Sequence, residues 1–317
     1  MPLLSRHLVL LAALCGTTTG WACSDCGCSF SSDWAAQGYG LRPGLGLGLR
    51  SEYYEQSELR AGTASVNRAA LSFPADNEIQ QRTVNRNTWL DLNYGFGSAG
   101  ALTLSVPYQD RFHATIAPGD TELSTSRASG LGDLRLLVRY PRPGTTDSLG
   151  FQFGLKLPTG GITQNFASGP QAGGLLDRGL QLGTGTTDLL VGASWFGRLM
   201  EQGSVFAQVQ ADQPLAARDG FVPGTSVALN SGIRWLNAGR LTPQLQLNLK
   251  AETREHGANA DTANSGGVFA YLSPGVTAEV TAGTLAFAFV QVPVYQRVNG
   301  LQLEPKWLLS LGLRWKL

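Results

Sequence analysis

Apolar and polar residues alternate through most of the sequence after about residue 44. Successive side chains of a β-strand point to opposite faces, so a period of two predicts strands with one apolar and one polar face. The C-terminal residues show the pattern clearly, with Leu308 as the exception. One face carries Trp307, Leu309, Leu311, Leu313, Trp315 and Leu317, and the other carries Ser310, Gly312, Arg314 and Lys316.

The same alternation predicts about twelve strands, each about as long as a tilted membrane strand needs to be. The expected ranges are 44–55, 83–94, 101–108, 131–140, 148–158, 185–196, 204–212, 225–235, 243–253, 267–277, 283–295 and 306–317.

The connections between these strands are expected to alternate between short and long. The short ones are 95–100, 141–147, 197–203, 236–242 and 278–282, and the long ones are 56–82, 109–130, 159–184, 213–224, 254–266 and 296–305. This order is typical of an outer-membrane barrel with short periplasmic turns, long extracellular loops and both termini in the periplasm. A Greek-key sandwich has no reason to keep it.

The predicted fold class is therefore all-β, a closed antiparallel transmembrane β-barrel. In lipid every backbone N–H and C=O needs an internal partner, so the first strand is expected to pair with the last. The apolar faces would contact lipid and the polar faces would line the lumen. The expected lumen-lining charges are Asp91, Asp133, Arg135, Arg139, Lys156, Asp188, Asp212, Arg234, Lys250 and Glu252.

Aromatic residues recur at the periplasmic ends of the predicted strands, on their apolar faces. Aromatic side chains are enriched where a membrane barrel meets the interface. The expected interface aromatics are Tyr94, Tyr140, Trp195, Trp235 and Trp315. The alternative is aromatic packing under the turns of a soluble protein, which would leave the loop order unexplained.

Composition agrees with a sheet that is apolar on one face only. Hydrophobic residues make up 43% of the chain and charged residues 15%, with a mean hydropathy of −0.05. Beyond the N-terminus there is no run of about eighteen apolar residues, which excludes a bundle of membrane helices.

The N-terminus has the pattern of an export signal. Arg6 and His7 precede an apolar run at 8–14, and Gly20-Trp21-Ala22 is a small-residue cleavage site. We therefore expect a signal peptide at 1–22, a periplasmic Cys-containing segment at 23–43 and an outer-membrane barrel at 44–317. Removing 1–22 takes one of the 24 basic residues and none of the 23 acidic ones, so nucleic acid is not an expected partner.

The mature N-terminus holds a dense set of thiols, Cys23, Cys26 and Cys28. In the oxidising periplasm two of them could form a disulfide that tethers the segment. Thiolates at this spacing could instead bind Cu(I) or Zn, or exchange disulfides with a partner protein. No other cofactor is expected.

Several short motifs resemble the outer-membrane barrel family of the MetA-pathway of phenol degradation. They are Gly130-Leu131-Gly132-Asp133-Leu134, Leu157-Pro158-Thr159-Gly160, Leu182-Gly183-Thr184-Gly185-Thr186-Thr187-Asp188, Leu272-Ser273-Pro274-Gly275 and Val298-Asn299-Gly300-Leu301-Gln302-Leu303. The resemblance covers about residue 45 to the end, and it implies a Gram-negative barrel that passes small, hydrophobic or aromatic compounds. The chain departs from the family in ending at Leu317, where such barrels end in Phe, and in its Cys-rich N-terminus.

The expected function is a porin-like channel, with the lipid bilayer and a small-molecule permeant as partners. The alternative is a scaffold barrel whose Cys-rich segment recruits a periplasmic partner protein or a metal. An enzyme is not expected. A hydrolase would need a Ser near a His with an acid or amide. His113 and His256, the two histidines of the mature chain, fall at outer strand ends or in loops; Ser124, Ser126 or Ser129 could approach one of them, but nothing in the sequence fixes that geometry.

Overall fold

The structure is a computed structural model that describes residues 43–142, 148–236 and 239–317. The expected signal peptide at 1–22 and the three clustered cysteines lie outside the described residues. None of the helices in the described ranges is long and apolar enough to cross a membrane.

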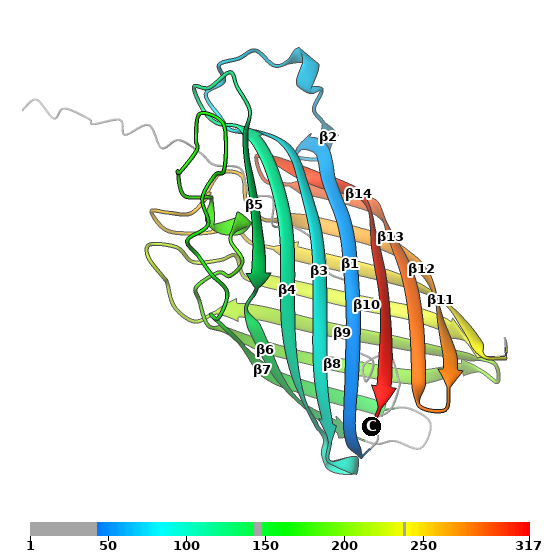
Figure 1. Ribbon diagram of the computed structural model, residues 1–317. Helices are drawn as coiled ribbons and strands as arrows, with labels where there is room; N and C mark the ends of the chain where they lie inside the picture. Colours follow the sequence, from blue (N-terminus) through cyan, green and yellow to red (C-terminus); the bar gives the residue numbers. More distant parts are fainter. Residues whose placement is uncertain (1–42, 143–147, 237–238) are drawn as a thin grey trace, which may run out of the picture.

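Twelve antiparallel strands form a closed, tilted barrel (Figure 1). They are β1 (Gly44–Ala61), β3 (Ile79–Gly95), β4 (Ala101–Ile116), β6 (Leu134–Arg142), β7 (Ser148–Leu157), β8 (Asp188–Met200), β9 (Gly203–Pro214), β10 (Ser226–Trp235), β11 (Leu241–Glu252), β12 (Gly267–Thr281), β13 (Thr284–Val298) and β14 (Leu301–Lys316). Two extra strands, β2 (Ala64–Ser65) and β5 (Ser124–Leu131), pair with β1 and β4, and three short 3-10 helices, η1 (Arg68–Ala70), η2 (Gly97–Ala99) and η3 (Arg178–Leu180), lie in connections.

The first and last strands close the barrel as expected from the requirement for paired backbone groups. β1 pairs with β14 from Gly46 opposite Lys316 to Ala61 opposite Leu301. Every other neighbouring pair in the ring is consecutive along the chain except where β2 and β5 branch off. On the turn-ward side of the point where β5 gives way to β6 along β4, the wall of the barrel therefore has no open edge.

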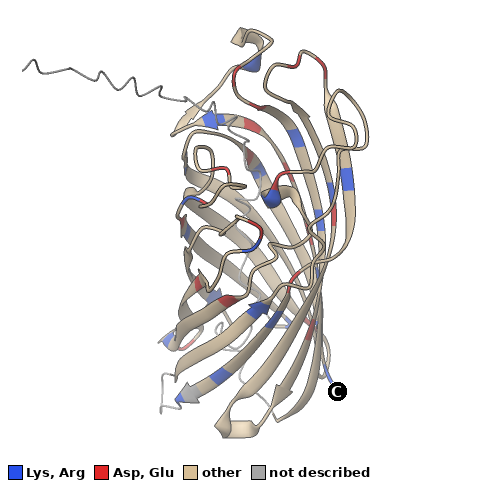
Figure 2. Cartoon of the chain, turned by 90° about the vertical axis from the view of Figure 1, so that its left-hand side faces the viewer, with Lys and Arg blue, Asp and Glu red and all other residues tan. Residues whose placement is uncertain are grey.

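Alternating side chains separate an apolar exterior from a largely polar interior. On β7, Phe151, Phe153 and Leu155 are exposed on the outside, whereas Gln152 and Lys156 are buried inside. The same division recurs on β6, β8 and β11, and charged residues are sparse along the strands (Figure 2). A continuous apolar exterior of this size is not compatible with water and is suited to the lipid of a bilayer.

The interior also carries aromatic side chains that the alternation did not indicate. Phe269, Tyr271, Phe287 and Phe289 are buried on β12 and β13. On this side of the barrel the inward face is therefore partly aromatic.

Two glycines make room for these rings. A Cβ atom at Gly275 would lie 2.0 Å from the ring of Phe289, and one at Gly312 would lie 2.4 Å from the ring of Phe287. Each ring thus covers a glycine on a neighbouring strand, an arrangement that packs a sheet closely where a side chain would not fit.

Two of the expected long links are strands instead. The range 109–130 was predicted as a loop, but β4 continues to Ile116 and pairs with β5. The outward-facing residues of this hairpin include Asp110 and Arg127, so it lacks the apolar alternation that marked the other strands.

The range 296–305 was also predicted as a long loop, and this too is wrong. β13 runs to Val298 and β14 begins at Leu301, leaving Asn299-Gly300 as a two-residue turn with Gly300 at φ 66°. The positive φ of Gly300 is a conformation that glycine adopts without steric cost.

The barrel wall is higher on one side than on the other. β1, β3, β4 and β14 contain 18, 17, 16 and 16 residues, whereas β6, β7 and β10 contain 9, 10 and 10. Above the low side, the connection 158–187 folds over the opening (Figure 1). We call the end of the barrel with this connection the loop end, and the opposite end, where the C-terminus lies, the turn end.

Candidate functional site

A cavity of about 250 Å³ occupies the lumen near the loop end. Its walls come from β1, β3, β4, β6 to β11 and the connection 158–187, so side chains distant in the sequence converge on it. Its charged lining residues are Glu52, Arg111, Asp133, Arg135, Lys156, Arg178, Asp188, Asp212, Lys250 and Glu252.

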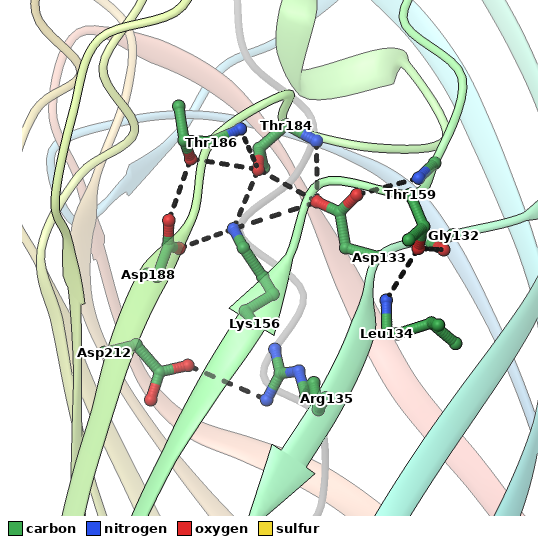
Figure 3. Close-up of polar contacts among 11 residues, drawn as sticks. Gly132, Asp133, Leu134, Arg135, Lys156, Thr159, Thr184, Thr186, Asp188 and Asp212 are labelled. Carbon is green, nitrogen blue, oxygen red and sulfur yellow. Dashed lines mark hydrogen bonds and ion pairs between the residues drawn. The ribbon is translucent and has the colours of Figure 1, made fainter.

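Lys156 lies at the centre of the polar contacts on one side of this cavity (Figure 3). Its Nζ is 2.5 Å from Asp188 Oδ2 and 3.9 Å from Asp133 Oδ2, and it donates a hydrogen bond of 2.8 Å to Thr184 Oγ1. All three charged side chains are less than one-tenth exposed. A buried ammonium group needs such partners because its desolvation is costly when it is unpaired.

Asp133 joins the barrel wall to both ends of the connection 158–187. Its Oδ1 accepts a hydrogen bond of 2.9 Å from Gly160 N, and its Oδ2 accepts bonds of 2.9 Å from both the backbone N and the Oγ1 of Thr184. Thr159 Oγ1 adds a bond of 2.9 Å to Gly132 O and accepts one of 3.0 Å from Leu134 N. The connection is therefore fastened at its start and at its finish.

The position of Asp133 follows from an interruption in the sheet. β5 ends at Leu131 and β6 begins at Leu134, and the residues Tyr108 and Ser105 of β4 pair with Leu131 and Arg135. Three steps on β4 thus face four on the other strand, which is the spacing of a β-bulge. The extra residue allows the Asp133 carboxylate to turn toward the connection.

Close contact between two glycines holds the two ends of the connection together. A Cβ at Gly160 would lie 2.6 Å from Gly183 Cα, and one at Gly183 would lie 2.7 Å from Gly160 Cα. Gly183 N donates a hydrogen bond of 3.1 Å to Gly161 O. Larger residues would force the two segments apart and away from Asp133.

A second group of contacts surrounds Trp89 of β3, which also lines the cavity. Trp89 Nε1 donates a hydrogen bond of 3.1 Å to Glu52 Oε2, and the guanidinium groups of Arg50 and Arg135 lie 5.0 and 5.8 Å from its ring centre. Arg135 is also 3.7 Å from Asp212 Oδ2. The cavity therefore combines paired charges with an aromatic surface that cations contact.

Arg111 anchors the middle of the connection from inside the barrel. Its Nε donates a hydrogen bond of 2.7 Å to Asn85 Oδ1. Its Nη1 donates hydrogen bonds of 2.8 Å to Gly179 O and of 3.3 Å to Gln181 O. Gly179 belongs to η3. Together with Asp133, this side chain holds the connection inside the opening.

Acidic side chains of three connections act on one another at the loop end. Burial, together with the charges of Glu255, Asp261 and Glu78, raises the pKa of Asp177 well above its usual range. Burial also raises the pKa of Asp261 to about 6, although hydrogen bonds from Asn264 and Ala263 oppose the shift. Packing of the loops 158–187 and 253–266 is therefore favoured by protonation.

The expected lumen residues fall into two groups in the structure. Seven of them line the cavity: Asp133, Arg135, Lys156, Asp188, Asp212, Lys250 and Glu252. Asp91, Arg139 and Arg234 do not line it. Their hydrogen-bond partners are Ser105, Thr103 and Ser204, which lie on neighbouring strands farther toward the turn end.

The expected interface aromatics lie on the outer face near the turn end. Tyr94, Tyr140, Trp195 and Trp235 are between 38% and 61% exposed, and Trp315 is half-buried. A second set of exposed or half-buried aromatics, Tyr53, Tyr108, Tyr295 and Trp307, lies on the outer face toward the loop end. On β14, Trp307 and Trp315 are eight residues apart, which is about 26 Å along a strand.

Neither His113 nor His256 lines the cavity. His113 Nδ1 is 2.8 Å from Thr83 Oγ1 and its Nε2 is 3.7 Å from Glu78 Oε1, and all three side chains are at most 1% exposed. Ser126 faces His113 across β4 and β5. His256 lies in the exposed loop 253–266. The imidazole of His113 is therefore shielded from solvent, whereas that of His256 is exposed.

Several residues of the site were absent from the sequence-based set. Glu52 shares the inward face of β1 with Arg50 and Gln56, so the same period-two pattern could have indicated it. Thr184 and Arg178 lie in an irregular connection, where periodicity carries no information on side-chain direction. Among the described residues no group of three His, Cys, Asp or Glu side chains has the geometry to hold a metal ion.

Comparison with known proteins shows similarity in structure only. No protein-family profile matches the sequence, and no curated protein is similar to it. The chain is similar to the COG4313 outer membrane channel from Pseudomonas putida F1, with 15% identity over 90% of this chain and 99% of the other and a TM-score of 0.63.

Two further solved structures have lower scores. The NanC porin has 9% identity over 86% of this chain and 100% of the other at a TM-score of 0.46. The Pseudomonas putida toluene transporter TodX has 10% identity over 95% and 97% at 0.42. At these sequence identities, the similarity of the chain to the three solved structures concerns the fold alone. The closed barrel and its apolar exterior place the protein in the outer membrane.

Proposed function

We propose that the protein is a porin-like channel for small molecules, with the loop-end cavity as the site where a permeant binds on entry. The observation that carries the proposal is a cavity of about 250 Å³ inside a closed barrel, walled by charges of both signs. A barrel of twelve strands is intermediate between filled eight-stranded barrels and water-filled pores of sixteen strands.

The chemistry of the cavity favours a small molecule with an aromatic part and a charged part. Trp89 offers a ring face, Tyr54, Pro107 and Leu182 add apolar surface, and Arg135 presents a cation beside that ring. This agrees with the hydrophobic or aromatic permeants implied by the resemblance to the MetA-pathway of phenol degradation family. The connection 158–187 would then control access to the cavity, because Asp133 and Arg111 hold it there.

The test is solute uptake by liposomes that contain the purified protein. Swelling in sodium benzoate should be faster than in sodium gluconate, and the variant Trp89→Ala should lose that preference. The variant Trp235→Ala, which changes an exposed aromatic far from the cavity, is the matched control. Liposomes that swell in neither solute would contradict a channel, and equal rates for wild type and Trp89→Ala would contradict the aromatic preference.

A scaffold barrel remains the alternative function. In that case the segment 23–43, with its three cysteines, would recruit a periplasmic partner or a metal. Single-channel recordings with and without residues 23–43 separate the two functions, because a scaffold would be silent in both forms.

A further inference from the structure

The outer face of the high wall changes from apolar to charged within four residues along β3 and within two residues along β4. On β3 the outward residue Leu90 is followed toward the loop end by Thr88 and Arg86. On β4 Tyr108 is followed by Asp110 in the same way. This change marks the level at which the acyl chains of the outer leaflet give way to lipid headgroups.

Two arginines converge on one carboxylate at this level. Arg127 donates two hydrogen bonds to Asp110, of 3.0 Å from Nε and 2.9 Å from Nη2. Arg86 Nη1 is 3.5 Å from the same carboxylate, and its guanidinium lies 6.0 Å from the ring centre of Tyr53. A guanidinium has five N–H donors, so these contacts to Asp110 use one donor of Arg86 and two of Arg127.

Two more bases extend this surface along the wall. Arg82 Nη2 is 2.8 Å from Glu55 Oε2, and Lys306 Nζ is 3.0 Å from Glu58 Oε1. The basic patch is thus Arg82, Arg86, Arg127 and Lys306, whose side chains are 51%, 52%, 66% and 67% exposed. Four bases face three acids in these contacts, so the patch carries a net positive charge in the described structure.

Apolar side chains lie directly on the membrane side of the patch. Leu90, Tyr108 and Leu131 are 36%, 48% and 56% exposed on the outer faces of β3, β4 and β5. Tyr53, opposite Arg86 in the register, contacts Trp307 with ring centres 5.7 Å apart and ring planes tilted by 39°. A ligand on this surface would therefore contact cationic side chains with one end and apolar side chains with the other.

We propose that the basic patch binds the phosphate groups of a lipid in the outer leaflet, with its acyl chains along Leu90, Tyr108 and Leu131. Guanidinium groups recognise phosphate through charge-assisted hydrogen bonds. The aromatic side chains at the interface fix the depth at which the headgroup meets Arg86 and Arg127. This surface is on the outside of the barrel and is independent of transport through the lumen.

The test measures binding of diphosphoryl lipid A to the purified full-length barrel by native mass spectrometry. The double variant Arg86→Gln/Arg127→Gln should bind about tenfold more weakly, which corresponds to about 1.4 kcal/mol, because two guanidinium groups that recognise phosphate by charge-assisted hydrogen bonds are lost. Arg86→Lys/Arg127→Lys should retain intermediate binding. Arg198→Gln/Lys316→Gln, which removes two exposed bases at the turn end, is the matched control and should bind as the wild type does.

Two further arms identify the source of the phosphate. Dephosphorylated lipid A should bind as weakly to the wild type as diphosphoryl lipid A binds to the double variant, and inorganic phosphate at millimolar concentration should not compete. Equal binding by wild type and Arg86→Gln/Arg127→Gln would overturn the site. Full competition by inorganic phosphate would overturn the assignment to a lipid. Migration of unheated and heated samples on gels confirms that each variant is folded.

Discussion

Lys156 on β7 and Asp188 on β8 form an ion pair of 2.5 Å inside the barrel, where β7 ends and β8 begins. Asp133, in the interruption between β5 and β6, lies 3.9 Å from the same ammonium group. One cation thus balances two carboxylates beside the cavity, so its removal should change both the stability of the barrel and the ions that enter it.

The variant Lys156→Gln should leave two buried carboxylates without their cation. Loss of one partner from a buried ion pair costs about 3–5 kcal/mol, and the uncompensated negative charge should shift the reversal potential under a KCl gradient toward cation selectivity. Lys156→Gln/Asp188→Asn should recover most of both losses. Lys306→Gln, on the outer surface, is the control, and a selectivity change of the same size there would contradict the role of Lys156.

Asp133→Ala should release the connection 158–187 from the barrel wall. The change removes the acceptor of three hydrogen bonds, from Gly160 N, Thr184 N and Thr184 Oγ1. We expect more frequent or larger openings in single-channel recordings. Asp212→Ala also removes a carboxylate from the cavity but makes no contact with Gly160 or Thr184 in the described structure, so it should open less. Identical recordings for the two variants would argue against a fastening role for Asp133.

Gly275→Ala should destabilise the barrel because its methyl group would overlap the ring of Phe289. Overpacking of this kind costs about 1–3 kcal/mol, measured as a lower urea midpoint in detergent. The double variant Gly275→Ala/Phe289→Leu should regain part of the loss. Gly46→Ala is the control, because a Cβ there would meet its nearest neighbour at 3.4 Å. Equal effects of Gly275→Ala and Gly46→Ala would show that the ring is not the cause.

The loop carboxylates should make closure of the channel depend on pH. The pKa of Asp261 is raised from 3.8 to about 6, so between these values the packed loops bind more protons than the released loops. Stability of the packed state therefore falls as pH rises through this window, by about 3 kcal/mol for this group. The open probability should be higher at pH 7 than at pH 4.

Asp261→Asn provides the check on that pH dependence. The amide does not titrate, so the difference between the open probabilities at pH 4 and pH 7 should shrink. Asp219→Asn, which removes an exposed carboxylate from another loop, should leave the difference as it is in the wild type. An undiminished pH effect in Asp261→Asn would assign the titration to other groups.

Strand positions could be predicted from the sequence because the bilayer imposes a strict rule on each of them. Phe151, Phe153 and Leu155 must face lipid while Gln152 and Lys156 face the interior, and this alternation is readable without any knowledge of neighbours. Above the bilayer the rule no longer applies. The hairpin of β4 and β5 therefore appeared as a loop, and the Asn299-Gly300 turn was missed although its sequence is a turn signal.

The site was predictable only as far as strand alternation reaches. Lys156 and Asp188 were placed on inward faces, but their partner Thr184 lies in an irregular connection whose path depends on Asp133 and on the contact between Gly160 and Gly183. Likewise, Phe289 could be placed inside only with knowledge that Gly275 stands opposite. Contacts such as that between Phe289 and Gly275 depend on the register between neighbouring strands, which cannot be read from a single sequence.

The unequal height of the wall has a consequence for what the cell surface presents. β1, β3, β4 and β14 rise on one side, whereas β7 and β10 end early on the other. Bulky objects that approach from outside, such as an antibody or a phage tail, would meet the raised hairpins first and be kept from the cavity. Solutes small enough to pass beside the connection 158–187 would reach it from the low side. The slope of the rim thus acts as a coarse size filter ahead of any chemical selection in the lumen.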